Sequence, residues 1–149
     1  MKIHVNRVPE EGTTNRATYD PGTMDMERSD IHLREPFDVE AFITLAEKEL
    51  IVKADIRCPL VVTCARCLEE FPSMVRADAV FSYTAQPTDV VDITEDVRQE
   101  IVLAYPMIPL CRPDCKGLCR SCGQNLNMGL CSHQAAVQRI GEGSAERER

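Results

Sequence analysis

The region 30–84 contains successive short runs rich in Val, Ile, Thr and Phe, separated by polar positions. In two of these runs apolar residues occupy every second position, at 39, 41, 43 and 45 and again at 75, 77, 79 and 81. This period of two is typical of β-strands, because successive side chains point to opposite faces of a sheet. The pattern predicts an antiparallel β-meander, one face of which needs a cover.

The segment 94–105 is predicted to form the helix that covers this sheet. Its apolar residues recur every four positions and line one helical face: Ile93, Val97, Ile101 and Tyr105. Thr94 stands where an N-cap is expected, and two acidic residues follow it in the first turn, where they complement the helix dipole. Pro106 and Pro109 end the helix.

The two ends of the chain differ from this centre. The segment 2–8 alternates weakly and predicts a short strand, whereas 9–29 is polar and predicts a long loop that could contain a helical turn. After residue 110 the chain is rich in cysteine, glycine and polar residues, which cannot form an apolar core. We therefore expect an α+β core domain over 1–110 and a zinc-knuckle segment packed on it over 111–133. The region 134–149 is expected to contain the rest of a short helix, which spans 133–140, and a disordered charged tail.

Length and composition narrow the class of protein. The chain has 149 residues, of which 44% are hydrophobic and 28% charged, as in ordinary soluble domains. It contains no apolar run of the roughly 18–20 residues that cross a bilayer, and its start lacks a secretory signal pattern. We expect a cytoplasmic protein without a membrane partner. In that reducing compartment, closely spaced cysteines are more often metal ligands or redox groups than disulfides.

Seven cysteines and one histidine form a pattern of closely spaced pairs that can supply eight zinc ligands. They are Cys64, Cys67, Cys111, Cys115, Cys119, Cys122, Cys131 and His133. Zn²⁺ prefers four sulfur or nitrogen ligands in a tetrahedron, and a C-x2-C turn lets two thiolates reach one ion. Nearby glycines at 117, 123 and 129 would allow the tight turns that such a site needs. The pattern predicts one or two structural zinc ions.

Two partitions of these ligands are compatible with the spacing. The preferred one has a first site of Cys64, Cys67, Cys111 and Cys115, and a second site of Cys119, Cys122, Cys131 and His133. The alternative is one zinc ribbon of Cys64, Cys67, Cys119 and Cys122, with the remaining cysteines as spare ligands. In the preferred partition both sites are fully ligated, with no position open for water, so they are expected to be structural rather than catalytic.

Other candidate residues receive simpler interpretations. Cys58 stands outside every pair and is expected to pack as a small apolar residue. Four basic residues beside the ligands would offset thiolate charge, or alternatively form a small patch that binds RNA: Arg66, Arg112, Lys116 and Arg120. The net charge of −7 and the lack of aromatic residues in this patch argue against non-specific binding of nucleic acid.

Acidic residues at 89, 92, 95 and 96 are interpreted as a solvated loop and a first helical turn, and no catalytic motif is present.

The stretches VVTCARCLEEF, DVRQEIVLAYPMIPLC and CRPDCKGLCRSCGQNLN resemble the YceD family, the large ribosomal RNA subunit accumulation proteins. The family's last pair is usually Cys-x-Cys, whereas this chain has Cys131 and His133. The resemblance implies a non-enzymatic factor that supports 23S rRNA accumulation or processing and large-subunit assembly. Its partner would be a ribosomal protein, an rRNA maturation factor or immature 23S rRNA, with no small-molecule substrate. A thiol-based redox or zinc-sensing protein is the alternative function.

Overall fold

The computed structural model describes residues 1–129 and 131–133. Its elements follow one another as β1 (Lys2–His4), a 3-10 helix η1 (Val5–Arg7), β2 (Thr13–Tyr19), a second 3-10 helix η2 (Pro21–Thr23), β3 (Ile31–His32), β4 (Phe37–Ala46), β5 (Glu49–Thr63), β6 (Glu70–Thr84), β7 (Val90–Asp92) and α1 (Thr94–Leu103). Among the described residues, no helix has the length and apolar character needed to span a membrane.

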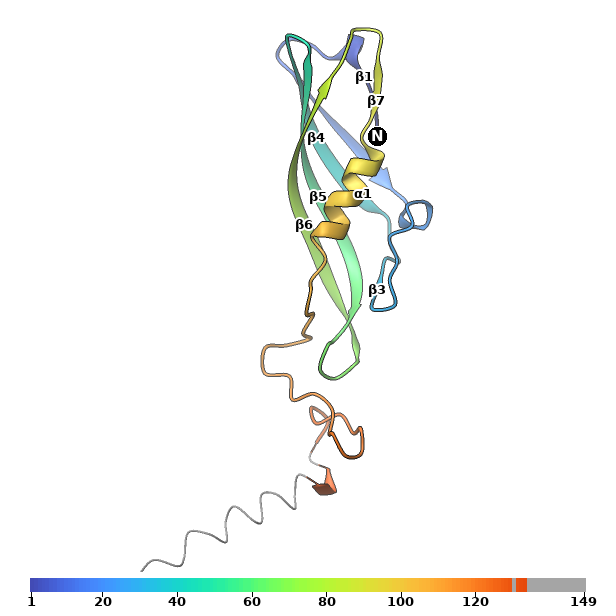
Figure 1. Cartoon of the computed structure of the whole chain (residues 1–149), viewed down its shortest axis with the longest axis vertical. Coiled ribbons are helices and arrows are strands. Elements are labelled where there is room, and N and C mark those ends of the chain that lie inside the picture. Colours follow the sequence, from blue (N-terminus) through green and yellow to red (C-terminus); the bar gives the residue numbers. More distant parts are fainter. Residues whose placement is uncertain (130, 134–149) are drawn as a thin grey trace, which may run out of the picture. The chain divides into compact units, whose positions relative to one another are not determined.

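A five-stranded sheet is built around the long strand β5 (Figure 1). β4 pairs antiparallel with the first part of β5 and with β2, while β3 pairs antiparallel with β5 at Val61 and Val62. β6 pairs with β5, and β1 and β7 form a separate two-stranded antiparallel sheet. The predicted α+β class, with an antiparallel meander and one main helix, is confirmed.

The apolar core follows the alternation of the strands. Val39, Ala41 and Ile43 are all fully buried on β4, and every second residue of β5 from Leu50 to Val62 is buried. Helix α1 lies across the sheet (Figure 1) and buries the predicted apolar residues of one helical face, at 93, 97, 101 and 105. Since burial of one such aliphatic side chain contributes about 1.5–3 kcal/mol, this apolar face is the main reason the helix is stable.

Helix α1 begins and ends slightly differently from the prediction. Its N-cap residue is Ile93, not Thr94, which is the first helical residue. Asp92 supplies the capping carboxylate, because its Oδ1 accepts hydrogen bonds from the Thr94 N–H (3.1 Å) and the Thr94 hydroxyl (2.6 Å). The helix ends at Leu103, before the predicted end at 105, yet Tyr105 stays buried and donates its hydroxyl to the Met26 carbonyl at 2.8 Å.

The predicted strand over 2–8 is only half correct. β1 ends at His4 because it has just three partners on β7, and residues 5–7 form η1 instead. The Val8 N–H donates to the Val5 carbonyl at 3.2 Å and closes this 3-10 turn.

The predicted loop over 9–29 contains an additional strand, β2. It pairs with β4 along its whole length, from Thr13 opposite Ile43 to Tyr19 opposite Phe37. Its side chains are mostly polar, so alternation of apolar residues could not reveal it. Polar pairs across the two strands take the place of that signal, such as Arg16 with Glu40 at 2.8 Å. The anticipated helical turn is η2.

The chain divides into two compact units. The first contains Met1–Val62 and Pro72–Met107, and the second contains Thr63–Phe71 and the described residues from Ile108 onward. All eight candidate ligands belong to the second unit. The domain boundary at residue 110 remains a proposal, and the expected short helix after His133 and the charged tail lie outside the described residues.

Candidate metal centres

The first candidate centre joins two segments of the second unit that are far apart in sequence. Cys64 and Cys67 lie in the turn between β5 and β6, where the Leu68 N–H donates to the Cys64 carbonyl at 3.0 Å. Cys111 and Cys115 lie in the segment after Pro109, whose carbonyl accepts a hydrogen bond from the Ala65 N–H at 2.8 Å. These backbone bonds hold the two cysteine pairs against each other.

The sulfur atoms of this first centre have the spacing that a tetrahedral metal requires. The Sγ atoms of Cys64 and Cys115 are 3.8 Å apart, and those of Cys67 and Cys111 are 3.7 Å apart. Four thiolates at 2.3 Å from a tetrahedral zinc ion lie about 3.8 Å from one another. All four sulfurs are within 4.8 Å of each other, so this group could hold a metal ion.

The surroundings of the first centre favour the thiolate at two of its four cysteines, Cys64 and Cys115. Burial alone would raise the pKa of Cys64, but N–H groups of Cys111, Cys67 and Arg66 outweigh it and lower that pKa to about 6. The Asn127 side chain is the main cause of a lowered pKa at Cys115. Burial raises the pKa of the Cys111 thiol to about 12, with neighbouring thiols adding to the shift. Because metal cations bind thiolates, the site already carries part of the negative charge that a metal ion requires.

The second candidate centre is local to the C-terminal segment. Cys119 and Cys122 lie in a tight turn, in which the Gly123 N–H donates to the Cys119 carbonyl at 2.9 Å. Hydrogen bonds from the Ser121 and Cys122 N–H groups lower the pKa of Cys119 to about 6. The ligand atoms of Cys119, Cys122, Cys131 and His133 all lie within 4.8 Å of one another. This group could also hold a metal ion, with Cys122 and His133 on its exposed side.

Asn127 contacts the first centre from outside its ligand set. Its Nδ2 donates to the Cys115 Sγ at 3.3 Å, and its Oδ1 accepts from the Lys116 N–H at 2.9 Å. Sequence reasoning missed this residue. The one available signal was its position in the polar GQNLN stretch directly after a cysteine pair.

Gly117 permits the close approach of the two segments. It has a φ of +73°, and a Cβ at this position would lie 3.0 Å from the Arg66 carbonyl oxygen. The Leu118 N–H donates to that same oxygen at 3.1 Å. The predicted glycines at 123 and 129 also have positive φ. A larger residue at 117 would therefore strain the contact between the two segments.

The basic residues near the ligands bond to oxygen rather than to sulfur. Arg66 donates from Nη1 to the Cys115 carbonyl at 3.0 Å, and Arg112 lies 3.7 Å from Asp114. Lys116 and Arg120 are exposed. Cys58 is fully buried on β5, where burial raises the pKa of its thiol to about 11, so its predicted packing role is confirmed.

The structure brings the eight predicted ligands together in the two groups of the preferred partition. It places the C-x2-C pairs of the single-ribbon alternative in different groups. The acidic residues at 92, 95 and 96 make structural contacts: Asp92 caps α1, Glu95 pairs with Arg98 at 3.0 Å, and Asp96 accepts a hydrogen bond from the Tyr83 hydroxyl. Zinc as the bound metal, and the role of these eight residues as its ligands, remain predictions.

Comparison with known proteins gives one family and several partial relatives. The model of the family described as large ribosomal RNA subunit accumulation protein YceD matches residues 82–141. An uncharacterized protein of Mycobacterium tuberculosis is 33% identical over 102 residues, which are 58% of this chain and 49% of the relative. A Mycobacterium leprae protein is 29% identical over 107 residues, 61% of this chain and 49% of the relative.

A maize protein named large ribosomal RNA subunit accumulation protein YCED homolog 1, chloroplastic, is 46% identical over 37 residues, which are 25% of this chain and 13% of the maize protein. The chain spans about half the length of the mycobacterial relatives. No solved structure matches it.

Proposed function

Since this chain belongs to the YceD family, we propose that it supports accumulation of large-subunit ribosomal RNA. More specifically, it acts as a non-enzymatic factor in 23S rRNA accumulation or processing and in assembly of the large subunit. The observation that carries this proposal is the family match over 82–141, which includes helix α1 and six of the eight candidate ligands.

In this proposal the two centres hold Zn²⁺ and order a segment that has little apolar core of its own. The small buried clusters of the second unit consist mainly of cysteines, with Leu126 as a partner in one of them. Structural zinc contributes on the order of 10 kcal/mol of apparent folding free energy in small modules, which exceeds what these clusters gain by burial. The ordered chain then presents a binding surface.

Among the proposed partners, a ribosomal protein fits the surface best. The chain carries a net charge of −7, which attracts basic proteins and repels the phosphates of free RNA. The second unit also exposes large apolar side chains, including Leu68 at 63% and Met128 at 79% exposure. Apolar side chains beside charged ones are typical of protein–protein contacts. An rRNA maturation factor or immature 23S rRNA remain the other partners in this proposal.

The cellular function is tested by depletion and complementation. We expect depletion to lower mature 23S rRNA and the proportion of large subunits on a sucrose gradient. Wild-type protein and the Cys58→Ser variant should restore both, whereas Cys64→Ser should not, because only Cys64 belongs to a centre. Unchanged 23S rRNA and subunit ratios after depletion would refute the proposal.

Metal content is tested on the purified chain. We expect two zinc ions per chain by elemental analysis. Cys64→Ser and Cys119→Ser should each lose one of them, because each affects a different centre, while Cys58→Ser should retain both. A wild-type chain that holds one zinc ion, which is lost in either variant, would instead indicate one shared site.

A thiol-based redox or zinc-sensing function is the second candidate, and one observation favours it. Cys122 is exposed, and the neighbouring Cys119 has a thiol pKa of about 6, so the second centre offers an accessible cysteine beside a readily ionised one. Mild peroxide treatment distinguishes the two functions. An assembly factor should retain its zinc, whereas a sensor should release it from the second centre and recover it after reduction.

A further inference from the structure

β6 is a long edge strand with one open side. It runs for 15 residues and has β5 as its partner in the sheet. Within the described residues, no other strand pairs with it, and no further backbone hydrogen bond reaches residues 72–84. Natural sheets protect such edges by keeping them short, by bulges or by repeated lysines, because an open edge can pair with another chain. β6 is 15 residues long and contains no lysine.

Pro72 identifies the backbone groups that face the open side. Proline cannot donate to a ladder, so within a strand its nitrogen must point away from the paired neighbour. Backbone direction alternates along a strand. The N–H and C=O groups of Met74, Arg76, Asp78 and Val80 therefore also point to the open edge, where they lack strand partners.

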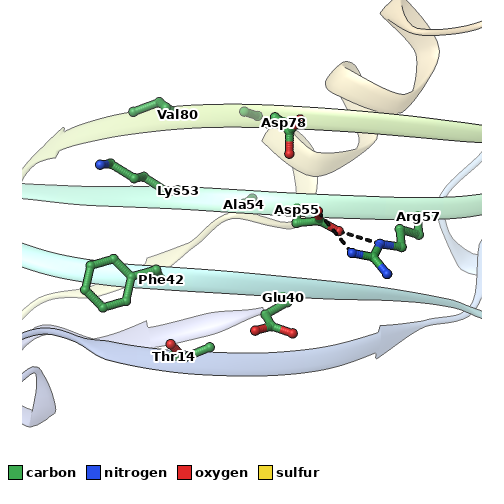
Figure 2. Close-up of a pocket in the computed structure, with 10 residues that line it drawn as sticks. Thr14, Glu40, Phe42, Lys53, Ala54, Asp55, Arg57, Asp78 and Val80 are labelled. Atoms are coloured by element: carbon green, nitrogen blue, oxygen red, sulfur yellow. Dashed lines mark hydrogen bonds and ion pairs between the residues drawn. The ribbon is translucent and has the colours of Figure 1, made fainter.

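The side chains of these four residues lie on the exposed face of the sheet. Figure 2 shows Asp78 and Val80 on β6 beside Lys53 and Asp55 of β5. Met74 is 50% exposed and Val80 is 67% exposed, so both leave apolar surface on this face of β6. Asp55 already pairs with Arg57 at 2.8 Å, and no ion pair links Arg76 or Asp78 to another residue in the described part of the chain.

These residues are arranged symmetrically about Ala77. One step away on either side are opposite charges, Arg76 and Asp78, and three steps away are the two exposed apolar residues, Met74 and Val80. We propose that two copies of this chain associate through β6, antiparallel and centred on Ala77, to form one continuous sheet. Arg76 of each copy then lies opposite Asp78 of the other, and Met74 opposite Val80.

This arrangement selects both the partner and the register. In the proposed register, the backbone groups at the open edge exchange about eight hydrogen bonds between the two strands. A shift by one residue would set exposed side chains opposite buried ones. A shift by two residues keeps the exposed side chains on the same face. In one direction it would set Arg76 opposite Arg76, and in the other it would set Asp78 opposite Asp78. Like charges directly opposite each other destabilise a strand pair. Because Met74, Arg76, Asp78 and Val80 are complementary to the same residues in reverse order, a second copy of this chain always supplies the matching strand.

The experiment measures the mass of the full chain in solution by analytical ultracentrifugation. The wild type is expected at twice the chain mass of 16.7 kDa, with dissociation on dilution. Arg76→Asp and Asp78→Arg, made singly, should each give monomers because each creates like-charged pairs. The double exchange R76D/D78R should restore the dimer. Circular dichroism checks that every variant is folded.

Mixing the two single variants tests the register directly. An Arg76→Asp chain and an Asp78→Arg chain carry complementary charges at each mirrored position, so they should form a heterodimer although neither forms a homodimer. Arg16→Asp, on the opposite edge strand β2, is the matched control and should remain dimeric. A monomeric wild type would overturn the proposal and favour a strand of another protein at this edge. A dimer that persists in both single variants, or a mixture that stays monomeric, would overturn it as well.

Discussion

At the scale of single residues, the candidate metal ligands could be predicted from the sequence, whereas the residues that hydrogen-bond to those ligands could not. Cysteine and histidine ligands can be recognised by residue type and spacing, and the structure groups all eight candidates as in the preferred partition. Asn127 was not predicted, because it acts through a hydrogen bond to Cys115 that forms only when the chain folds back on itself. An asparagine in a polar loop has no distinguishing pattern.

Replacement of Asn127 by alanine is expected to weaken metal binding at the first centre. The substitution removes the donor to the Cys115 Sγ and the acceptor of the Lys116 N–H. Loss of such supporting bonds typically lowers metal affinity about 10–100-fold. Competition with a chromophoric chelator measures this loss. Gln124→Ala, at an exposed position in the same segment, should leave the affinity unchanged; an equal loss in both variants would contradict the role of Asn127.

Arg98 is a second residue whose role depends on the folded chain. Its Nε donates to the Met24 carbonyl at 2.7 Å, and its Nη2 donates to the Asp25 carbonyl at 3.1 Å. Arg98→Met should lower the free energy of unfolding by about 2 kcal/mol, because hydrogen bonds from a charged donor are lost while the stem remains. Urea denaturation gives the value. The exposed neighbour Gln99 provides the control, since Gln99→Met should change stability by less than about 0.5 kcal/mol.

At the scale of elements, the success of prediction depended on whether an element buries an apolar face. Helix α1 and strands β4 and β6 do so, and their periods of four and two were visible in the sequence. β2 was missed because it is held by backbone bonds to β4 and by polar side-chain pairs. Its place is set by the neighbouring strand rather than by its own pattern.

The two faces of α1 should respond differently to truncation. Ile101 is fully buried, so Ile101→Ala is expected to cost about 2–5 kcal/mol of unfolding free energy through lost burial and a cavity. Leu103 is 79% exposed, and Leu103→Ala should cost less than about 0.5 kcal/mol. Chemical denaturation of both variants measures the difference. Similar costs would show that the helix does not depend on its apolar face.

At the scale of the whole molecule, the two units are stabilised by different means. The first has a continuous aliphatic core, of which Ile43, Val52 and Ile101 are fully buried members. The second buries mainly cysteines. The composition change after residue 110 revealed the second unit, and the preferred ligand partition joined the turn that carries Cys64 and Cys67 to it, although the predicted domain bounds left this turn in the core domain.

Removal of metal is therefore expected to unfold one unit and spare the other. After chelation, hydrogen exchange should become fast over residues 108–129, while amides of β4 and β5 up to residue 62 stay protected by the core. Added zinc should restore the slow exchange. Equal loss of protection in both units would show that the first unit also depends on metal.

The long sequence separation within the first centre also determines when it can form. Cys64 and Cys115 are 51 residues apart, so during synthesis the first cysteine pair leaves the ribosome well before the second. At about 5–20 residues per second, that interval is about 2–10 s. For this time the nascent chain carries Cys64 and Cys67 without their partners, whereas the second centre draws its ligands from a single short stretch. Under the proposed function, metal can therefore bind at the first centre only late in the synthesis of each chain.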